Sequence, residues 1–298
     1  MMPPALQPPH PVDRTVLAMG TRLTLADLPP AAAEAALAEV ARIEAACSTW
    51  RPDSAWSRAN GAGEAWTPLD GAWLDLLRLA RAWSERTEGA FDPVLGTLVA
   101  AWGLRTGGAR PGPAELAAAR AASGIARLEV GPTAIRLTGG AQLEEGGFLK
   151  GYALDRARAE AQARGAARGL LDFGGQLLAW GGAWPADIAD PRDRSRARVR
   201  LRLVDASLST SGCAERGRHL LDPRTGRPCP DWGAVAVVAP GGLEADILST
   251  ALYVLGPRAG LAWAERNGVA ALFLGHGAPP RASRAFQALH PIYLKEAP

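Results

Sequence analysis

The sequence predicts an α+β fold, with mixed sheets and flanking helices in one compact unit. Three observations indicate this class. Some segments carry apolar residues at the 3.6-residue spacing of a helix. Other, shorter segments alternate between apolar and polar residues or are apolar throughout, as strands are. The 298 residues contain neither an internal repeat nor a linker long enough to divide the chain into domains.

The N-terminal half is expected to begin with a disordered lead at residues 1–12, because its prolines exclude regular structure. The folded unit then covers residues 13–298. A strand with a bend at Gly20 is expected at Thr15–Leu25. The pattern further predicts helices at Ala31–Cys47, Leu69–Glu88 and Pro113–Ser123, and a hairpin with strands Arg127–Val130 and Ala134–Leu137.

The C-terminal half continues the mixture of helices and strands. Val199, Leu201 and Leu203 alternate with arginines, which is the period of a half-buried strand. Ala234–Ala239 is apolar throughout and predicts a buried strand. The same reasoning predicts helices at Gly151–Arg164, Glu244–Leu255 and Pro257–Asn267, and strands at Leu170–Asp172, Leu177–Trp180 and Val269–Leu274.

Composition and charge narrow the classes of function. Lys and Arg total 33 against 30 Asp and Glu, and this net charge of +3 is too small to predict a nucleic-acid partner. No apolar run approaches the ~20 residues of a membrane helix. The start of the chain lacks the order of an export signal, so we expect a cytoplasmic protein, or a periplasmic one if the start was trimmed.

The cysteines do not predict a metal site or a disulfide. Cys47, Cys213 and Cys229 have no metal-binding spacing and do not form an even framework. We therefore expect three buried or unreactive thiols.

A glycine-rich segment with a lysine precedes the predicted helix at Gly151–Arg164. It runs from Gly146 to Ala153 and contains Lys150, one of only two lysines in the chain. Glycines before a helix let a ligand approach the backbone, and the free N–H groups of the helix start favour phosphate. Taken alone, the segment also fits a tight turn.

A possible metal site lies on the predicted helix Glu244–Leu255. Asp246 and Thr250 are four residues apart and therefore share one face of a helix. A carboxylate and a hydroxyl suit Mg²⁺, which also binds substrate phosphates. The alternative is an Asp favoured by the helix dipole beside an ordinary surface Thr.

Further polar segments could have a functional or a structural role. Ser209-Thr210-Ser211-Gly212 could hold a phosphate or form a polar turn. His219 could act as a base or a ligand, although a lone histidine is more often structural. Gly89-Ala90-Phe91-Asp92-Pro93 could equally be a capped helix end, and Asp222-Pro223-Arg224-Thr225-Gly226 is a strong turn sequence in any case.

In combination and in order, these segments resemble the ApbE family of flavin transferases from about Val16 to Gly256. A series of unrelated motifs in the right order is highly specific. The matching segments are Met19-Gly20-Thr21, Ser48-Thr49-Trp50-Arg51, Gly89 to Pro93, Lys150 to Asp155, Gly174-Gly175, Thr210-Ser211-Gly212, His219 with Asp222 to Gly226, and Ala245-Asp246 with Thr250-Ala251.

The resemblance implies a fold, an activity and a set of site residues. It implies an α+β FAD:protein FMN transferase that attaches FMN through a phosphoester to a Thr or Ser of a partner protein, typically a subunit of a membrane-bound redox complex. It implies Mg²⁺ held by the Asp246 carboxylate, the Thr250 hydroxyl and the Gly147 carbonyl. It implies FAD contacts from Met19, Trp50, Ala90, Phe91, Asp92, Lys150 and His219.

The sequence departs from the family pattern at a few positions. Glu144 stands six residues before the lysine, where Asp is usual, and a flavin contact is implied there too. Asp172, followed by Phe173, stands where Asn is usual. Trp50 replaces another aromatic residue, often Tyr, and so keeps a stacking surface.

The implied chemistry is attack of an acceptor hydroxyl on the FMN phosphorus of FAD, in line with departing AMP. Mg²⁺ on the bridging oxygens would offset the developing charge. We expect Asp246 to hold this metal and Lys150 to clamp the phosphates. We expect His219 to help deprotonate the hydroxyl, because its ordinary pKa lies near neutrality.

Two rival functions use the same metal and flavin contacts. One is a non-catalytic FAD-binding protein, and the other is a Mg²⁺-dependent FAD pyrophosphatase that releases FMN and AMP. A hydrolase that uses Ser211 or Cys213 is disfavoured, because no Gly-x-Ser-x-Gly motif surrounds either residue.

Overall fold

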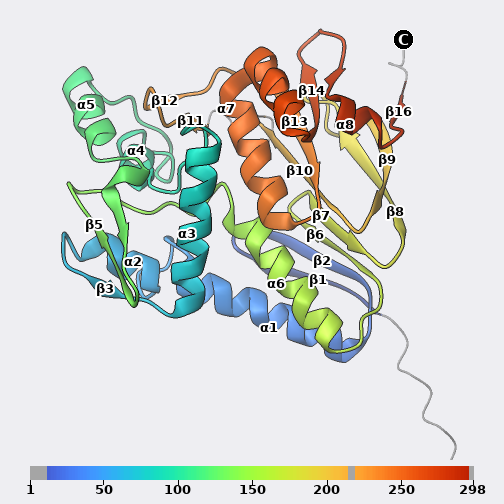
Figure 1. Cartoon of the computed structure of the whole chain (residues 1–298), viewed down its shortest axis with the longest axis horizontal. Coiled ribbons are helices and arrows are strands. Elements are labelled where there is room, and N and C mark those ends of the chain that lie inside the picture. Colours follow the sequence, from blue (N-terminus) through green and yellow to red (C-terminus); the bar gives the residue numbers. More distant parts are fainter. Residues whose placement is uncertain (1–11, 214–218, 295–298) are drawn as a thin grey trace, which may run out of the picture.

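The fold is known from a computed structural model that describes residues 12–213 and 219–294 (Figure 1). Most of the lead predicted for residues 1–12 lies outside the described residues. The centre is an eight-stranded antiparallel sheet in the order β1-β2-β6-β7-β10-β13-β14-β15. Its strands are β1 (Val12–Ala18), β2 (Thr21–Leu28), β6 (Gly169–Phe173), β7 (Gln176–Trp180), β10 (Ser207–Gly212), β13 (Gly233–Ala239), β14 (Ala270–Gly275) and β15 (Arg281–Ala282).

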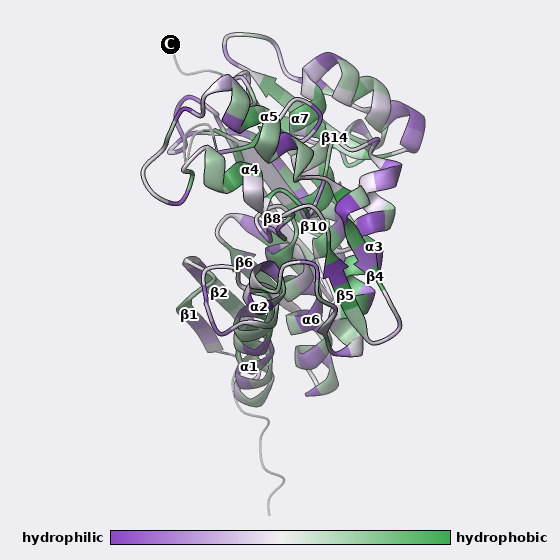
Figure 2. Cartoon of the chain, turned by 90° about the vertical axis from the view of Figure 1, so that its left-hand side faces the viewer, coloured by the Kyte–Doolittle hydropathy of each residue, from purple (hydrophilic) through white to green (hydrophobic). Residues whose placement is uncertain are grey.

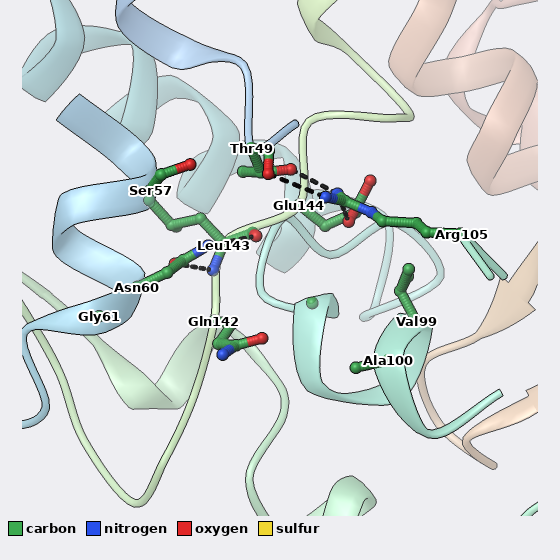
Figure 3. Close-up of a pocket in the computed structure, with 11 residues that line it drawn as sticks. Thr49, Ser57, Asn60, Gly61, Val99, Ala100, Arg105, Gln142, Leu143 and Glu144 are labelled. Atoms are coloured by element: carbon green, nitrogen blue, oxygen red, sulfur yellow. Dashed lines mark hydrogen bonds and ion pairs between the residues drawn. The ribbon is translucent and has the colours of Figure 1, made fainter. Parts of the chain in front are cut away.

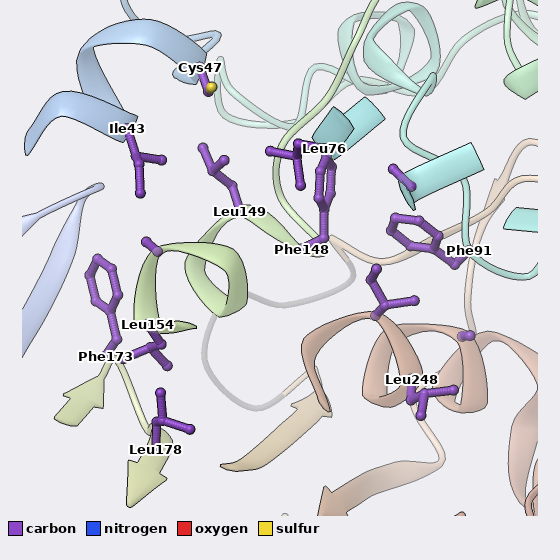
Figure 4. Packing of buried hydrophobic residues seen from close by; sticks show 14 of the residues in the cluster. Ile43, Cys47, Leu76, Phe91, Phe148, Leu149, Leu154, Phe173, Leu178 and Leu248 are labelled. Carbon is purple, nitrogen blue, oxygen red and sulfur yellow. The ribbon is translucent and has the colours of Figure 1, made fainter. Parts of the chain in front are cut away.

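Three helices cover one face of this sheet. They are α1 (Pro30–Cys47), α6 (Leu149–Ala163) and α7 (Gly242–Asn267). Alternate residues of the strands, such as Val235 and Phe273, join these helices in the main hydrophobic core. Figure 4 shows part of this core, with Phe148 at the start of α6 close to Phe91 and to α7.

A second sheet covers the opposite face. It consists of β8 (Ala183–Ala189), β9 (Ala197–Val204) and β16 (Ile292–Tyr293), and the short helix α8 (Arg284–Gln287) lies next to β14. The buried Val199, Leu201 and Leu203 of β9 share a core with Leu272. The half-buried strand predicted for this segment is therefore confirmed.

A group of smaller elements connects α1 to α6. It contains α2 (Ala55–Gly61), β3 (Thr67–Pro68), α3 (Gly71–Arg86), α4 (Gly96–Ala101), α5 (Pro113–Ala121), a 3-10 turn (Ile125–Arg127), β4 (Leu128–Val130) and β5 (Ala134–Leu137). The hairpin of β11 (Leu221–Asp222) and β12 (Arg227–Pro228) packs on α4 and α5, because Leu221 shares a small core with Leu98 and Ala119. The turn predicted at Asp222–Gly226 joins these two strands.

The α+β class is confirmed, and so are the predicted helices and most of the predicted strands. Helix α7 consists of two helical parts. Gly256, with φ 78° and ψ 171°, interrupts the helical conformation directly before Pro257, as expected. Figure 2 shows hydrophobic colouring along β14 and mixed colouring along α1 and α6. The buried residues of these two helices, such as Val40 and Leu154, belong to the main core. In the described part of the chain, no helix combines the length and apolar character that a membrane crossing requires.

One prediction of local structure was wrong, and one of two open alternatives is excluded. The single bent strand at Thr15–Leu25 is a hairpin of β1 and β2, because Met19 and Gly20 both have positive φ, at 45° and 71°, and reverse the chain. The segment Ser209-Thr210-Ser211 is not a turn. It lies in β10 in the middle of the sheet, where hydrogen bonds to β13 override the low strand propensity of serine.

Candidate active site

A close crossing of α6 and α7 brings the glycine-rich segment to the predicted metal site. A Cβ atom on Gly151 would lie 2.2 Å from the Gly242 carbonyl oxygen and 2.8 Å from Asp246 Cβ, so only glycine permits this approach. The Gly151 N–H donates to Asp246 Oδ2 at 3.0 Å. Lys150 Nζ lies 3.8 Å from the same oxygen.

The three predicted metal ligands lie together at this crossing. Asp246 is 5% exposed, and its Oδ1 accepts no hydrogen bond from the described residues. Thr250 follows one helical turn later. A Cβ atom on Gly147 would lie 3.4 Å from Thr250 Oγ1, so the backbone of Gly147 is next to that hydroxyl. One carboxylate, one hydroxyl and one carbonyl fit the oxygen preference of Mg²⁺.

The three predicted ligands do not by themselves complete a metal site. Within the described ranges, His, Cys, Asp and Glu nowhere gather in groups of three or more that could hold a metal ion. A cation at Asp246 would therefore need further oxygens from water or from a bound phosphate, as Mg²⁺ usually has.

A chain of hydroxyl groups supports Asp246 from the sheet. Ser249 Oγ donates to the Asp246 carbonyl at 3.0 Å and lies 3.1 Å from Ser209 Oγ and 2.9 Å from Ser211 Oγ. Thr210, between the two β10 serines, is exposed. The role of Ser209 and Ser211 is thus to anchor α7 on β10.

Asp155, in the segment that follows Lys150, caps the start of α7. Its two carboxylate oxygens accept hydrogen bonds from the N–H groups of Gly242 at 2.7 Å and Leu243 at 2.9 Å. A carboxylate at this end also interacts favourably with the helix dipole. The two motifs that carry Lys150 and Asp246 are therefore joined at both Gly151 and Asp155.

The segment Gly89 to Pro93 forms a tight turn after α3. Phe91 is buried and packs edge-on against Phe148, with ring centroids 5.6 Å apart. Asp92 Oδ1 accepts from Val94 N–H, and Oδ2 accepts from Ile125 N–H, both at 2.8 Å. Burial raises the pKa of Asp92 above its ordinary value, although these two N–H groups oppose the shift. The carboxylate of Asp92 thus stabilises the turn. This agrees with the alternative interpretation of the segment as a structural helix end.

The turn at Phe91 borders the three predicted metal ligands. Phe91 Cε2 would lie 3.6 Å from a Cβ atom on Gly147. The Glu144 N–H donates to the Pro93 carbonyl at 2.8 Å, which holds the two segments side by side. Ala90 is buried next to Phe91.

Trp50 and Glu144 belong to a second cluster, which is centred on Arg105. Figure 3 shows Arg105 together with Thr49 and Glu144. The Arg105 guanidinium forms an ion pair with Glu144 and hydrogen bonds with Thr49, and its Cζ lies 4.6 Å from the centroid of the Trp50 ring. Burial and the neighbouring Glu145 raise the pKa of Glu144 to about 7, although Arg105 opposes the shift. Sequence reasoning missed Arg105; the nearby Trp102-Gly103 was the only signal.

A cavity of about 330 Å³ lies beside this cluster, between α2, α4 and the segment that precedes Glu144. Arg105 and Glu144 line one side, and Asn60 lines another (Figure 3). The Asn60 amide is held by Leu143, since its Oδ1 accepts from the N–H at 2.7 Å and its Nδ2 donates to the carbonyl at 3.1 Å.

Two predicted flavin-contact residues lie on other elements. Met19 forms the tip of the β1–β2 hairpin and packs against the main core. His219 is half-buried and directly precedes the hairpin of β11 and β12. Arg218, next to it, is outside the described residues. The role of His219 as general base stays a prediction.

The three cysteines are buried and form no disulfide. Burial raises the pKa of Cys47 above its usual range and that of Cys229 to about 12. Cys213 Sγ lies 3.1 Å from the Tyr253 hydroxyl. The expectation of buried thiols is confirmed.

Comparison with known proteins identifies the family of this chain. The sequence pattern of the ApbE family matches residues 19–273, a range that contains Met19, Lys150, His219 and Asp246. The chain belongs to the ApbE family. It is therefore a transferase of the flavin transferase family, as the order of its motifs predicts.

Individual relatives agree with this assignment. The chain is 32% identical over 274 residues to an FAD:protein FMN transferase from Klebsiella pneumoniae, covering 80% of this chain and 77% of the relative. It is also 32% identical to an FAD:protein FMN transferase from Salmonella typhimurium, covering 76% of this chain and 72% of that one.

The fold of this ApbE family member matches solved structures along nearly all of its length. The flavinyl transferase ApbE of Pseudomonas stutzeri, in its apo form, matches with a TM-score of 0.85 and 30% identity, covering 94% of this chain and 96% of the other. The ApbE protein of Thermotoga maritima matches with a TM-score of 0.87 and 26% identity, covering 94% and 99%.

Proposed function

We propose that this protein transfers FMN from FAD to a Thr or Ser hydroxyl of an acceptor protein, with Mg²⁺ and with release of AMP. The observation that carries the proposal is the crossing of α6 and α7. There Lys150 Nζ lies 3.8 Å from a carboxylate that keeps one oxygen without a hydrogen-bond donor among the described residues. A cation site and a phosphate-binding lysine are what a diphosphate ligand requires.

FAD would lie between the two clusters. Its diphosphate would interact with the ammonium group of Lys150, which lies beside Asp246 at the start of α6. Trp50 offers a stacking surface for a flat ring, since it is 64% exposed. Met19, Ala90, Phe91, Asp92, Glu144 and His219 complete the proposed contacts.

Mg²⁺ would be held by the Asp246 carboxylate, the Thr250 hydroxyl and the Gly147 carbonyl, and it would supply positive charge where the diphosphate bond breaks. The residues of the chain fix this arrangement. Gly151 and Asp155 lock α6 to α7, and the hydroxyl of Ser249 holds the backbone at Asp246.

The transfer step forms one bond and breaks one bond. The acceptor hydroxyl oxygen attacks the FMN phosphorus of FAD, and the bond from that phosphorus to the oxygen bridging to AMP breaks. The hydroxyl proton passes to His219, and AMP leaves with the bridging oxygen. Lys150 lies beside Asp246 and would stabilise the charge on the diphosphate oxygens as the bond breaks.

The acceptor is a protein with an accessible Thr or Ser, and we propose that it belongs to the class of membrane redox-complex subunits. The test incubates the wild-type protein with FAD, Mg²⁺ and such an acceptor, and measures AMP and the intact mass of the acceptor. The expected result is AMP in equal amount to an acceptor that gained the mass of FMN. An acceptor with Val in place of the modified residue is the control.

The rival functions give other results in the same assay. Free FMN and AMP without a change in acceptor mass would identify an FAD pyrophosphatase. Bound FAD that stays intact would identify a non-catalytic binding protein. Either result contradicts the proposed transfer.

A further inference from the structure

Arg105 joins two segments that are far apart in the sequence (Figure 3). It lies in the loop after α4. Its Nη1 donates to the Thr49 carbonyl at 3.0 Å, and its Nη2 donates to the Thr49 hydroxyl and to the Glu144 carboxylate. One guanidinium therefore fixes the distance between the loop after α1 and the loop before α6.

The same guanidinium stacks on the ring of Trp50. Its Cζ lies 4.6 Å from the ring centroid, within the range of a cation–π contact. Among the described residues no other ring or guanidinium stacks on this indole. Trp50 is nevertheless 64% exposed, whereas the side chain of Arg105 is only 25% exposed. Arg105 thus sets the plane of a ring that keeps most of its surface open.

The charges around Arg105 make its position important. It faces two carboxylates, since Glu145 Oε2 lies 3.6 Å from its Nη2 in addition to the Glu144 pair. The side chains of Glu144 and Glu145 are 17% and 12% exposed, so both are shielded from water. Without Arg105, the two poorly solvated carboxyl groups would lose the cation that holds them, and the place of Glu144 would no longer be fixed.

We propose that Arg105 is a positioning residue for the flavin, because it holds both the plane of Trp50 and the carboxylate of Glu144 with a single guanidinium. A flat ring that stacks on the indole then meets a carboxylate oxygen of Glu144, a hydrogen-bond acceptor whose place is already fixed. This inference rests on the proposed function, in which Trp50 and Glu144 contact FAD.

The chain contains a matched control for the loss of such a contact. Arg136 stacks on Trp66, with its Cζ 5.3 Å from the ring centroid, and forms an ion pair with Glu129 at 2.7 Å. It lies on the β4–β5 hairpin and contacts none of the residues proposed to bind FAD. Arg136→Gln removes the same two kinds of interaction outside the proposed site.

The experiment measures FAD binding by flavin fluorescence and the KM and kcat of transfer. For Arg105→Gln we expect the Kd and KM for FAD to rise roughly ten- to hundredfold. We expect kcat to stay within about threefold, because Arg105 does not touch the proposed reacting atoms. Arg105→Lys keeps a charge near Glu144 and should recover part of the affinity, and Arg136→Gln should bind FAD like the wild type.

A double-mutant cycle separates positioning from general loss of stability. If Arg105 acts through Trp50, the Arg105→Gln effect shrinks in a Trp50→Ala background. Three results would each overturn the inference. The increase in Kd of the double variant could equal the product of the two single increases, the Kd of Arg105→Gln could equal that of Arg136→Gln, or Arg105→Gln could lower only kcat. Wild-type protein that binds FAD without transferring it contradicts only the proposed function, and wild-type protein that does not bind FAD contradicts both.

Discussion

The contact of α6 with α7 predicts that Gly151→Ala damages both stability and transfer. The added methyl group would lie 2.2 Å from the Gly242 carbonyl oxygen, where ordinary contact needs about 3.4 Å or more. The two helices would have to separate by roughly 1 Å, which overpacking data put at about 1–3 kcal/mol. For a domain of this size, that cost lowers Tm by roughly 2–5 °C.

The functional effect of Gly151→Ala should exceed its effect on stability. The separation moves the Lys150 side of the site away from Asp246 and lengthens the 3.0 Å hydrogen bond from Gly151 N–H to Asp246 Oδ2. A displacement of about 1 Å at reacting groups commonly costs about a hundredfold in rate. We therefore expect transfer to fall by about two orders of magnitude at a temperature where the variant is folded.

The assay combines differential scanning fluorimetry with AMP release from FAD and acceptor. Gly71→Ala is the control, because a Cβ atom there meets nothing within 4 Å at the start of α3. It should keep full activity and the same or a slightly higher Tm. A Gly151→Ala variant with wild-type Tm and wild-type AMP release would refute the reasoning.

Three further predictions concern single side chains. Asp246→Asn, like EDTA, should lower transfer by about a thousandfold or more while FAD still binds, measured by AMP release and flavin fluorescence; full activity would exclude the metal site. His219→Ala should lower kcat by about a hundredfold if this histidine takes the hydroxyl proton, and an unchanged kcat would remove it from that role. Burial raises the pKa of Glu144 from 4.5 to about 7. The stability that protonated Glu144 contributes is therefore fully present below a pH of 4.5 and is lost as the pH rises through about 7. The Tm of Glu144→Gln relative to wild type should therefore rise between about pH 5 and about pH 8, and a constant difference would contradict the raised pKa.

Periodicity and turn residues predict the long elements of this fold well. The apolar stretch at Ala234–Ala239 and the break at Gly256 correspond to β13 and to the interruption of α7. Short helices such as α2 and α4 carry too few residues for a period to appear, and tertiary contacts stabilise them. Strand β8 contains Pro185, which weakens the sequence pattern of a strand. The hairpin at Met19 was missed because a non-glycine residue at positive φ leaves no pattern in the sequence.

The candidate site could be predicted where a helix fixes the spacing. Asp246 and Thr250 share one face of α7 by helical geometry, and Lys150 stands at the start of α6. Arg105 was beyond sequence reasoning, because its contacts with Trp50 and Glu144 join segments about 40 to 55 residues away, and only tertiary structure brings these together.

The position of the cation tests the account most directly. Crystals of the protein grown with FAD and Mn²⁺ in place of Mg²⁺ allow the metal to be located by its anomalous scattering. We expect a peak at about 2.1 Å from Asp246 Oδ1 and Thr250 Oγ1, next to the Gly147 carbonyl and the FAD diphosphate. A peak at any other place, or FAD bound with its diphosphate far from Lys150, would contradict it.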